Sequence, residues 1–130
     1  ELATSAARAV LPPTLLREQA VANIGRSLLL GVTLESGRWD WLPAAMEDQL
    51  HQPYRAPLVK GLADVLRAAR QAGPCGAALS GAGPSVLALC PASAPLEAIG
   101  RAMTAAFAAQ GIGSRHLPLT VETQGARTEP

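Results

Sequence analysis

Apolar residues recur every four positions in the first part of the chain, which indicates a helix. Thr14 is placed to cap this helix and Ser36-Gly37 to end it. Its apolar positions are Leu16, Ala20, Ile24, Leu28 and Val32. The spacing predicts a long amphipathic helix that buries one face. Asp40 is expected to cap a shorter helix that runs to about Leu50.

The segment from His51 to Pro57 reads HQPYRAP and interrupts the helical pattern. Because proline lacks a backbone N–H and restricts the residue before it, two prolines here predict a rigid, mostly extended loop. A helical period then resumes at Leu58, Leu62, Val65, Leu66 and Ala69. Gly73-Pro74 is expected to end that helix.

Two short apolar runs, Gly76 to Ser80 and Ser85 to Cys90, flank the tetrapeptide GAGP and predict a hairpin of two strands. Ser93 is then expected to cap a helix that Gly111 and Gly113 close. The apolar positions of this helix are Leu96, Ile99, Met103, Ala106 and Phe107. Leu117 to Thr123 alternates in polarity and predicts a final strand.

The order of predicted elements is helix, helix, helix, strand, strand, helix, strand, without an internal repeat. It predicts an α+β sandwich with helices packed on one face of a small antiparallel sheet. Residues 1–130 are expected to form a single domain, with 1–13 as its leading segment and 124–130 as a flexible tail.

Composition narrows the class of partner. The 130 residues are 48% hydrophobic and 16% charged with a net charge of +1, and their basic residues are scattered. Nucleic acid and membrane surfaces are therefore not expected as partners, and the chain is expected in the cytoplasm. Cys75 and Cys90 lack metal-ligand spacing, so no metal site is expected and both are expected to be reduced, buried thiols. Because the chain begins at Glu1, a preceding segment is expected.

The first segment with possible chemistry is SGAGPS: Ser80, Gly81, Ala82, Gly83, Pro84 and Ser85. Glycines at alternate positions can take positive φ and gather backbone N–H groups around an anion or a carboxylate. A dinucleotide fingerprint or a P-loop would need a helix after the glycines, whereas an apolar run follows here. A tight hairpin turn without a ligand is the alternative that the residues alone favour.

The second such segment holds Arg55 between two prolines. A guanidinium on a fixed backbone is suited to a carboxylate or phosphate, since its planar fork matches two oxygens at once. An equally weighted alternative is a structural arginine bonded to the carbonyls of a neighbouring helix end.

The third segment is TSAARAVLP. Thr4 and Arg8 lie four residues apart, so on a helix a hydroxyl and a guanidinium would share one face and could meet one small ligand. The simpler alternative makes Thr4 the helix cap and leaves Arg8 in solvent. His51 and His116 are expected to be surface or satisfied histidines.

Taken together, the motifs TSAAR, LHQPYRAPL, LSGAGPSVLALC and VETQGAR resemble the C-terminal half of homoserine kinases, in the GHMP family of small-molecule kinases. LSGAGPS indicates only the GHMP family, while LHQPYRAP points to homoserine kinases. The resemblance covers nearly the whole chain. It implies a ferredoxin-like α+β layer and a glycine loop that faces the cleft between two domains.

The resemblance also implies an activity: transfer of the γ-phosphoryl of ATP, with Mg²⁺, to the hydroxyl of L-homoserine in threonine biosynthesis. Arg8 and Arg55 would then bind the carboxylate of homoserine, Thr4 would support the reacting hydroxyl, and Gly81 would bring backbone close to the substrate. A homodimer is left open.

Two departures from the family pattern bear on this expectation. Ala3 stands where the family usually has serine, and these 130 residues contain no glycine- and serine-rich nucleotide loop. Nor does a carboxylate match the family's Mg²⁺ ligand. The fragment alone is therefore expected to be inactive without an N-terminal nucleotide-binding domain. The alternatives are a free-standing ferredoxin-like module that binds a ligand or self-associates, and another GHMP kinase acting on a different alcohol.

Overall fold

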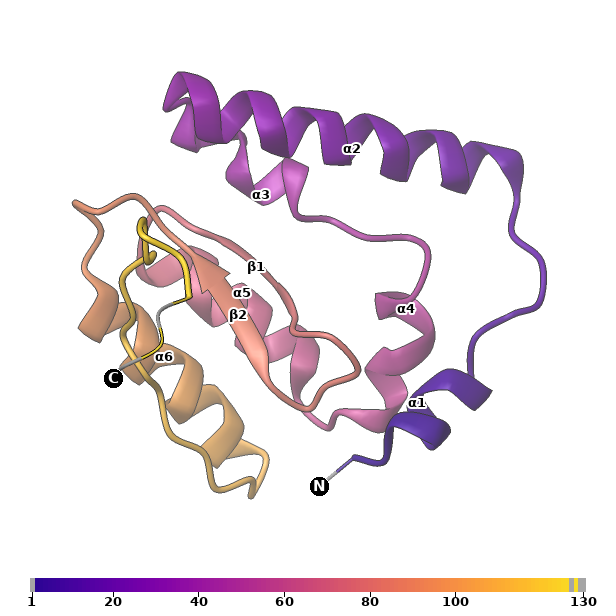
Figure 1. Ribbon diagram of the computed structural model, residues 1–130. Coiled ribbons are helices and arrows are strands. Elements are labelled where there is room, and N and C mark those ends of the chain that lie inside the picture. Colours follow the sequence, from indigo (N-terminus) through magenta and orange to yellow (C-terminus); the bar gives the residue numbers. More distant parts are fainter. Residues whose placement is uncertain (1, 127, 129–130) are drawn as a thin grey trace.

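A computed structural model describes residues 2–126 and 128. Its helices and strands, shown in Figure 1, follow in this order: α1 (Thr4–Ala9), α2 (Arg17–Ser36), the 3₁₀ turn η1 (Trp39–Trp41), α3 (Leu42–Ala45), α4 (Gln52–Arg55), the 3₁₀ turn η2 (Ala56–Leu58), α5 (Leu62–Ala72), β1 (Gly76–Leu79), β2 (Val86–Leu89) and α6 (Leu96–Ala109). The α+β class predicted from the sequence is confirmed.

The hairpin and the two helices that flank it in sequence, α5 and α6, are the elements that the apolar pattern predicted best. β1 pairs antiparallel with β2, with Gly76 opposite Leu89 and Leu79 opposite Val86. α5 and α6 pack against each other and against one face of this hairpin. The core between them is aliphatic and consists mainly of Leu62, Val65, Ala69, Cys75, Ala77, Leu79 and Ile99. It supports the hairpin whose turn is the glycine loop.

α2 is as long as predicted and ends at Gly37, which takes the left-handed conformation. Its cap was wrongly predicted: the helix begins at Arg17, and Gln19 Oε1 accepts the backbone N–H of Leu16. The expectation that its apolar face is buried was also wrong. Leu16, Ile24, Leu28 and Val32 are exposed, because α2 turns its buried Thr33 and its polar side chains toward the rest of the chain.

The predicted helix from Asp40 to about Leu50 is replaced by η1 and the single turn α3. Asp40 does not act as the cap, because its carboxylate pairs with the guanidinium of Arg38. α3 instead packs closely on β1, from the side opposite α5 and α6: a Cβ built on Gly76 would lie 2.7 Å from the carbonyl oxygen of Leu42 and would overlap the sulfur of Met46. This contact requires glycine at the start of β1.

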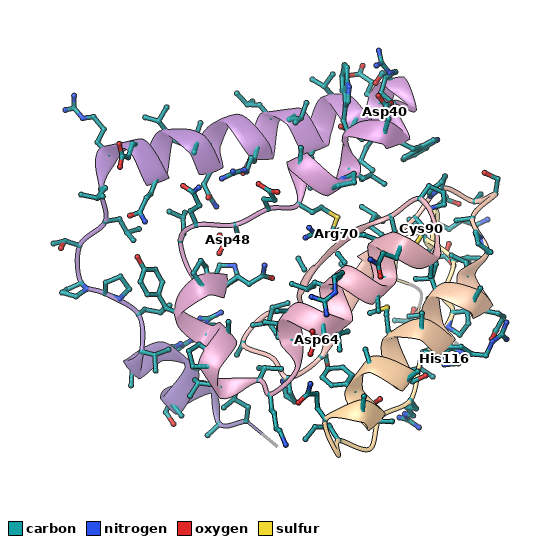
Figure 2. The ribbon with its side chains drawn as sticks, turned by 180° about the vertical axis from the view of Figure 1, so that it is seen from behind. Asp40, Asp48, Asp64, Arg70, Cys90 and His116 are labelled. Carbon is teal, nitrogen blue, oxygen red and sulfur yellow. The ribbon has the colours of Figure 1, made fainter. Side chains whose placement is uncertain are left out.

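Ser93 does not cap α6, since Pro95 occupies the position before its first turn. The final strand predicted at Leu117 to Thr123 is also absent from the described part of the chain. Alternating polarity alone does not make a strand, because a strand also has to pair with a neighbouring strand. His116 anchors this segment instead: its ring packs on Gly100 of α6, and its Nε2 lies 3.0 Å from the carboxylate of Glu97 (Figure 2).

Of the predicted flexible tail 124–130, residues 127, 129 and 130 lie outside the described residues. Within the described ranges, no helix combines the length and the apolar character needed to cross a membrane.

Candidate active site

One guanidinium connects the three segments that the sequence singled out. Arg55, the last residue of α4, donates from Nε to the carbonyl oxygen of Ala7 in α1, at 3.0 Å. Its Nη1 donates to the carbonyl oxygen of Gly81 in the glycine loop, at 2.9 Å. The β1–β2 turn, α4 and α1 accordingly lie together at one end of the molecule (Figure 1). Residues as far apart in the sequence as Ala7 and Gly81 thus form one site.

These bonds match the structural alternative for Arg55, in which it binds the carbonyl of a neighbouring helix end. They use Nε and one N–H of Nη1, and Nη1 also lies 3.4 Å from Nδ1 of His51. Nη2 makes no hydrogen bond to a described residue. One corner of the guanidinium therefore stays available for an anion, so the carboxylate role remains a prediction alongside the structural one.

The HQPYRAP segment was wrongly predicted as an extended loop. Pro53 and Pro57 each lie within the first two positions of a short helix, α4 and η2, where a missing N–H costs nothing and the fixed φ suits the helix. Both prolines therefore start helical turns, and the turn that Pro53 starts ends on Arg55.

Asp48 caps α4 from outside the helix, and the sequence analysis missed it. Its Oδ2 accepts the backbone N–H of His51 at 2.8 Å and that of Gln52 at 2.5 Å. Burial acts to raise the pKa of this carboxyl, but hydrogen bonds from Gln52, His51, Asn23 and Leu50 outweigh it and lower the pKa below its usual value. Asp48 is therefore ionised at neutral pH. An aspartate four residues before Gln52 was the available signal.

Asn23 ties this capped turn to α2. Its Nδ2 donates to Asp48 Oδ1 at 2.8 Å, and its Oδ1 accepts the backbone N–H of Gln49 at 2.9 Å. Asp48 lies between α2 and α4 in Figure 2. The short helix that carries Arg55 is thus held at its N-terminus by the carboxylate of Asp48, which Asn23 of α2 orients.

The glycine loop is the tight hairpin turn that the sequence favoured. Gly81 and Gly83 have φ of 59° and 88°, a region that glycine enters without strain. Ser80 donates its N–H to the carbonyl of Ser85 at 2.8 Å, and Gly83 donates to that of Ser80 at 3.1 Å. Because these two N–H groups bond within the turn, they are not free to bind an anion. Ser80, Gly81, Pro84 and Ser85 are exposed to an incoming molecule.

Thr4 and Arg8 lie on α1 as predicted, and Thr4 is the first helical residue rather than its cap. Both side chains are exposed. The described residues provide Arg8 with no hydrogen bond or ion pair, whereas the carbonyl of its neighbour Ala7 is held by Arg55. Among the described residues the guanidinium of Arg8 is therefore unpaired. Arg8 follows Ala7, the residue at which α1 meets α4. Contact of Thr4 and Arg8 with a ligand stays a prediction.

Among the described residues, the two histidines and the two cysteines show no arrangement typical of a catalytic or metal site. His51 contacts Arg55 and lies 3.8 Å from Asp48, so it is a satisfied histidine. Cys75 and Cys90 face each other one position beyond the last strand pair, and burial raises the pKa of Cys75 to about 11. A thiol with so high a pKa is protonated at neutral pH and a poor nucleophile. Within the described ranges, no three potential metal ligands cluster together.

Comparison with known proteins finds related sequences along nearly the whole chain. The family described as "GHMP kinases C terminal" matches residues 31–109. A homoserine kinase of Prochlorococcus marinus (strain MIT 9303) is 45% identical over 99% of this chain and 40% of its own length. One of Synechococcus sp. (strain RCC307) is 41% identical over 99% of this chain and 41% of its own length.

A solved structure with the same fold is the homoserine kinase of Cytophaga hutchinsonii, at a TM-score of 0.77 and 36% identity. The alignment covers 87% of this chain and 36% of that protein. The chain thus spans about 40% of the length of the curated relatives it matches. Since the family match extends over more than half of its residues, the chain belongs to the GHMP kinase family and carries the C-terminal fold of these enzymes.

Proposed function

We propose that this chain forms the C-terminal part of a homoserine kinase, which transfers the γ-phosphoryl of ATP to the hydroxyl of L-homoserine and yields O-phosphohomoserine. Support comes from the identity of 41–45% to relatives named homoserine kinase. The observation that carries the proposal is the Arg55 guanidinium, which joins α1, α4 and the glycine loop. Threonine biosynthesis in the cytoplasm is part of the same proposal.

In this reaction the chain would hold the amino-acid substrate. The free Nη2 of Arg55 and the unpaired guanidinium of Arg8 would bind the carboxylate of homoserine. Thr4 would support the hydroxyl, and Gly81 would let backbone approach the substrate. Such groups act by positioning, because holding the hydroxyl in line with the phosphate removes much of the entropic cost of a two-substrate reaction.

ATP and Mg²⁺ enter the proposal through the family alone. In the part of the chain that the structure describes, no cluster of three metal-ligating side chains is found. We assign this chain the substrate side of the reaction. The nucleotide side would belong to an N-terminal domain.

The test is a phosphorylation assay on the full-length protein that contains this sequence. With ATP and Mg²⁺, L-homoserine should yield O-phosphohomoserine, detected by ³¹P NMR and by ADP release. L-serine, L-threonine and a set of sugar alcohols serve as competing substrates. Preferred phosphorylation of one of these would identify another GHMP kinase, and absence of turnover with every alcohol would favour a binding module.

The isolated chain is the matched control, because it lacks the glycine- and serine-rich loop. We expect it to release no ADP above background. Phosphorylation of homoserine by these 130 residues alone would contradict the division of roles between the two domains.

A further inference from the structure

Gln52 makes a hydrogen bond that no motif predicted. Its side-chain Oε1 accepts the backbone N–H of Leu79 at 2.6 Å, across 27 positions of sequence. Leu79 is the last residue of β1 and immediately precedes the glycine loop. The bond therefore lies where the strand ends and the loop begins.

The register of the hairpin explains why this N–H needs a partner. Ser80 donates its N–H to Ser85 across the hairpin, so the next pair, Leu79 and Val86, is a pair without mutual hydrogen bonds. The N–H of Leu79 consequently points away from β2, to the open edge of β1. An edge donor left unpaired loses a hydrogen bond or binds water and leaves the end of the strand free to move. Gln52 supplies the acceptor that a further strand would otherwise provide.

Gln52 and Arg55 act on the same loop from one turn of helix. They lie three positions apart on α4 and therefore share a face. Gln52 accepts from Leu79, and Arg55 donates to the carbonyl of Gly81, so the two side chains hold the backbone on either side of Ser80. Two bonds of opposite polarity fix both the position and the direction of this segment.

We propose that Gln52 is a positioning residue, which holds the start of the glycine loop in the conformation that binds the amino-acid substrate. It acts through Leu79 and does not touch the substrate. This inference rests on the proposed function, since it takes the loop to be the substrate-binding element. It concerns an amide side chain to which none of the sequence motifs assigns a role.

The first test measures kinetics on the full-length protein. Gln52→Met keeps the length of the side chain and removes the acceptor, and we expect it to raise KM for L-homoserine roughly tenfold, the usual effect of losing one hydrogen bond in a partly buried site. KM for ATP should stay within about twofold. Gln52→Glu keeps an acceptor oxygen and should recover most of the affinity. Gln71→Met on the exposed surface of α5 is the matched control and should leave both constants unchanged.

The second test needs no substrate. In amide hydrogen exchange of the full-length protein, Gln52→Met should accelerate exchange of Leu79 and the loop roughly tenfold, while amides in the middle of α6 stay unchanged. A variant with a lower Tm but an unaltered KM for homoserine would make Gln52 merely structural and overturn the proposal. Unaltered exchange at Leu79 would overturn it as well.

The two tests separate this inference from the proposed function. A wild-type protein that phosphorylates another alcohol, or none, would refute the homoserine kinase assignment. Exchange at Leu79 would still decide whether Gln52 holds the loop, and the KM of the alcohol that is phosphorylated would replace that of homoserine.

Discussion

Replacing Arg55 with lysine should loosen the glycine loop by a predictable amount. In the native chain Nε and Nη1 each donate to a backbone carbonyl, at 3.0 Å to Ala7 and 2.9 Å to Gly81. Lysine has one ammonium group, which cannot reproduce two donors that diverge from a planar fork. Arg55→Lys should therefore weaken both bonds.

A hydrogen bond from a charged donor contributes about 1.5–3 kcal/mol. The bond to Gly81 is exposed to solvent, where a released carbonyl can bind water, so the lower end of this range applies. About 1.5 kcal/mol corresponds to roughly tenfold faster opening of the loop. Both the position of α1 and that of the glycine loop depend on this one side chain, and the increase should appear in both segments.

Hydrogen exchange of the full-length protein, followed by mass spectrometry, measures this directly. Peptides that cover α1 and residues 79–83 should exchange roughly tenfold faster in Arg55→Lys. Arg101→Lys is the matched control, since that arginine lies on α6 with 67% of its side chain exposed and should leave both peptides unchanged. Equal exchange rates in Arg55→Lys and the native protein would refute the conclusion that Arg55 connects the two segments.

Two further substitutions test the packing and the charge around this site. Gly76→Ala forces a Cβ against the carbonyl oxygen of Leu42. Such overpacking should lower the free energy of unfolding by about 1–3 kcal/mol, measured by urea titration. Gly113→Ala, whose Cβ would lie in open space, is the control and should change the free energy of unfolding little. Asp48→Asn should cost about 1.5–3 kcal/mol at pH 7, because the carboxylate accepts several N–H groups. Since the folded-state pKa of Asp48 is lowered, its contribution is present above the ordinary value of 3.8 and fades as the pH falls through the lowered pKa. A difference between Asp48→Asn and the native protein that does not shrink on acidification would contradict this account.

Core elements followed from the sequence because their apolar side chains are buried at regular helical or strand spacing. Val65 and Ala69 on α5 and Ile99 on α6 are buried at the spacing that the pattern implies. Ala77 and Leu79 of β1 face the same core. Apolar periodicity predicts which face of an element is buried, and in these elements the predicted faces are the buried ones.

The same reasoning failed where a partner group outside the apolar pattern decides the local structure. Pro53 was interpreted as a helix breaker, yet the Asp48 carboxylate supplies the cap that lets proline start α4. Leu117 alternates with polar neighbours like a strand residue but is 63% exposed, because no strand in the described part of the chain pairs with it. Ile24 kept a helical period without a covering surface. In each case the residue pattern was present in the sequence, but it did not show which partner group the residues would meet.

For the site, the sequence identified the segments and the structure supplied their connection. Arg55 was singled out from the sequence, but its bonds to Ala7 and Gly81 span 48 and 26 positions, and no local spacing encodes such distances. Gln52 was missed because it acts on a backbone N–H, a group that every residue except proline carries and no motif distinguishes. Asp48 was missed although its spacing before Gln52 was a signal for a cap.

Because Arg55 holds two backbone carbonyls and is also proposed to bind the substrate carboxylate, the kinetics of its variants can have two causes. Two of its three nitrogens hold the backbone, so a raised KM for homoserine in Arg55→Lys would arise from a displaced loop even if the guanidinium never met the substrate. Gln52→Met displaces the same loop without altering a cation. If both variants accelerate loop exchange equally and Arg55→Lys raises KM further, the excess measures the contact between Arg55 and the carboxylate. If the two rises in KM are equal, Arg55 acts as Gln52 does and does not contact the carboxylate.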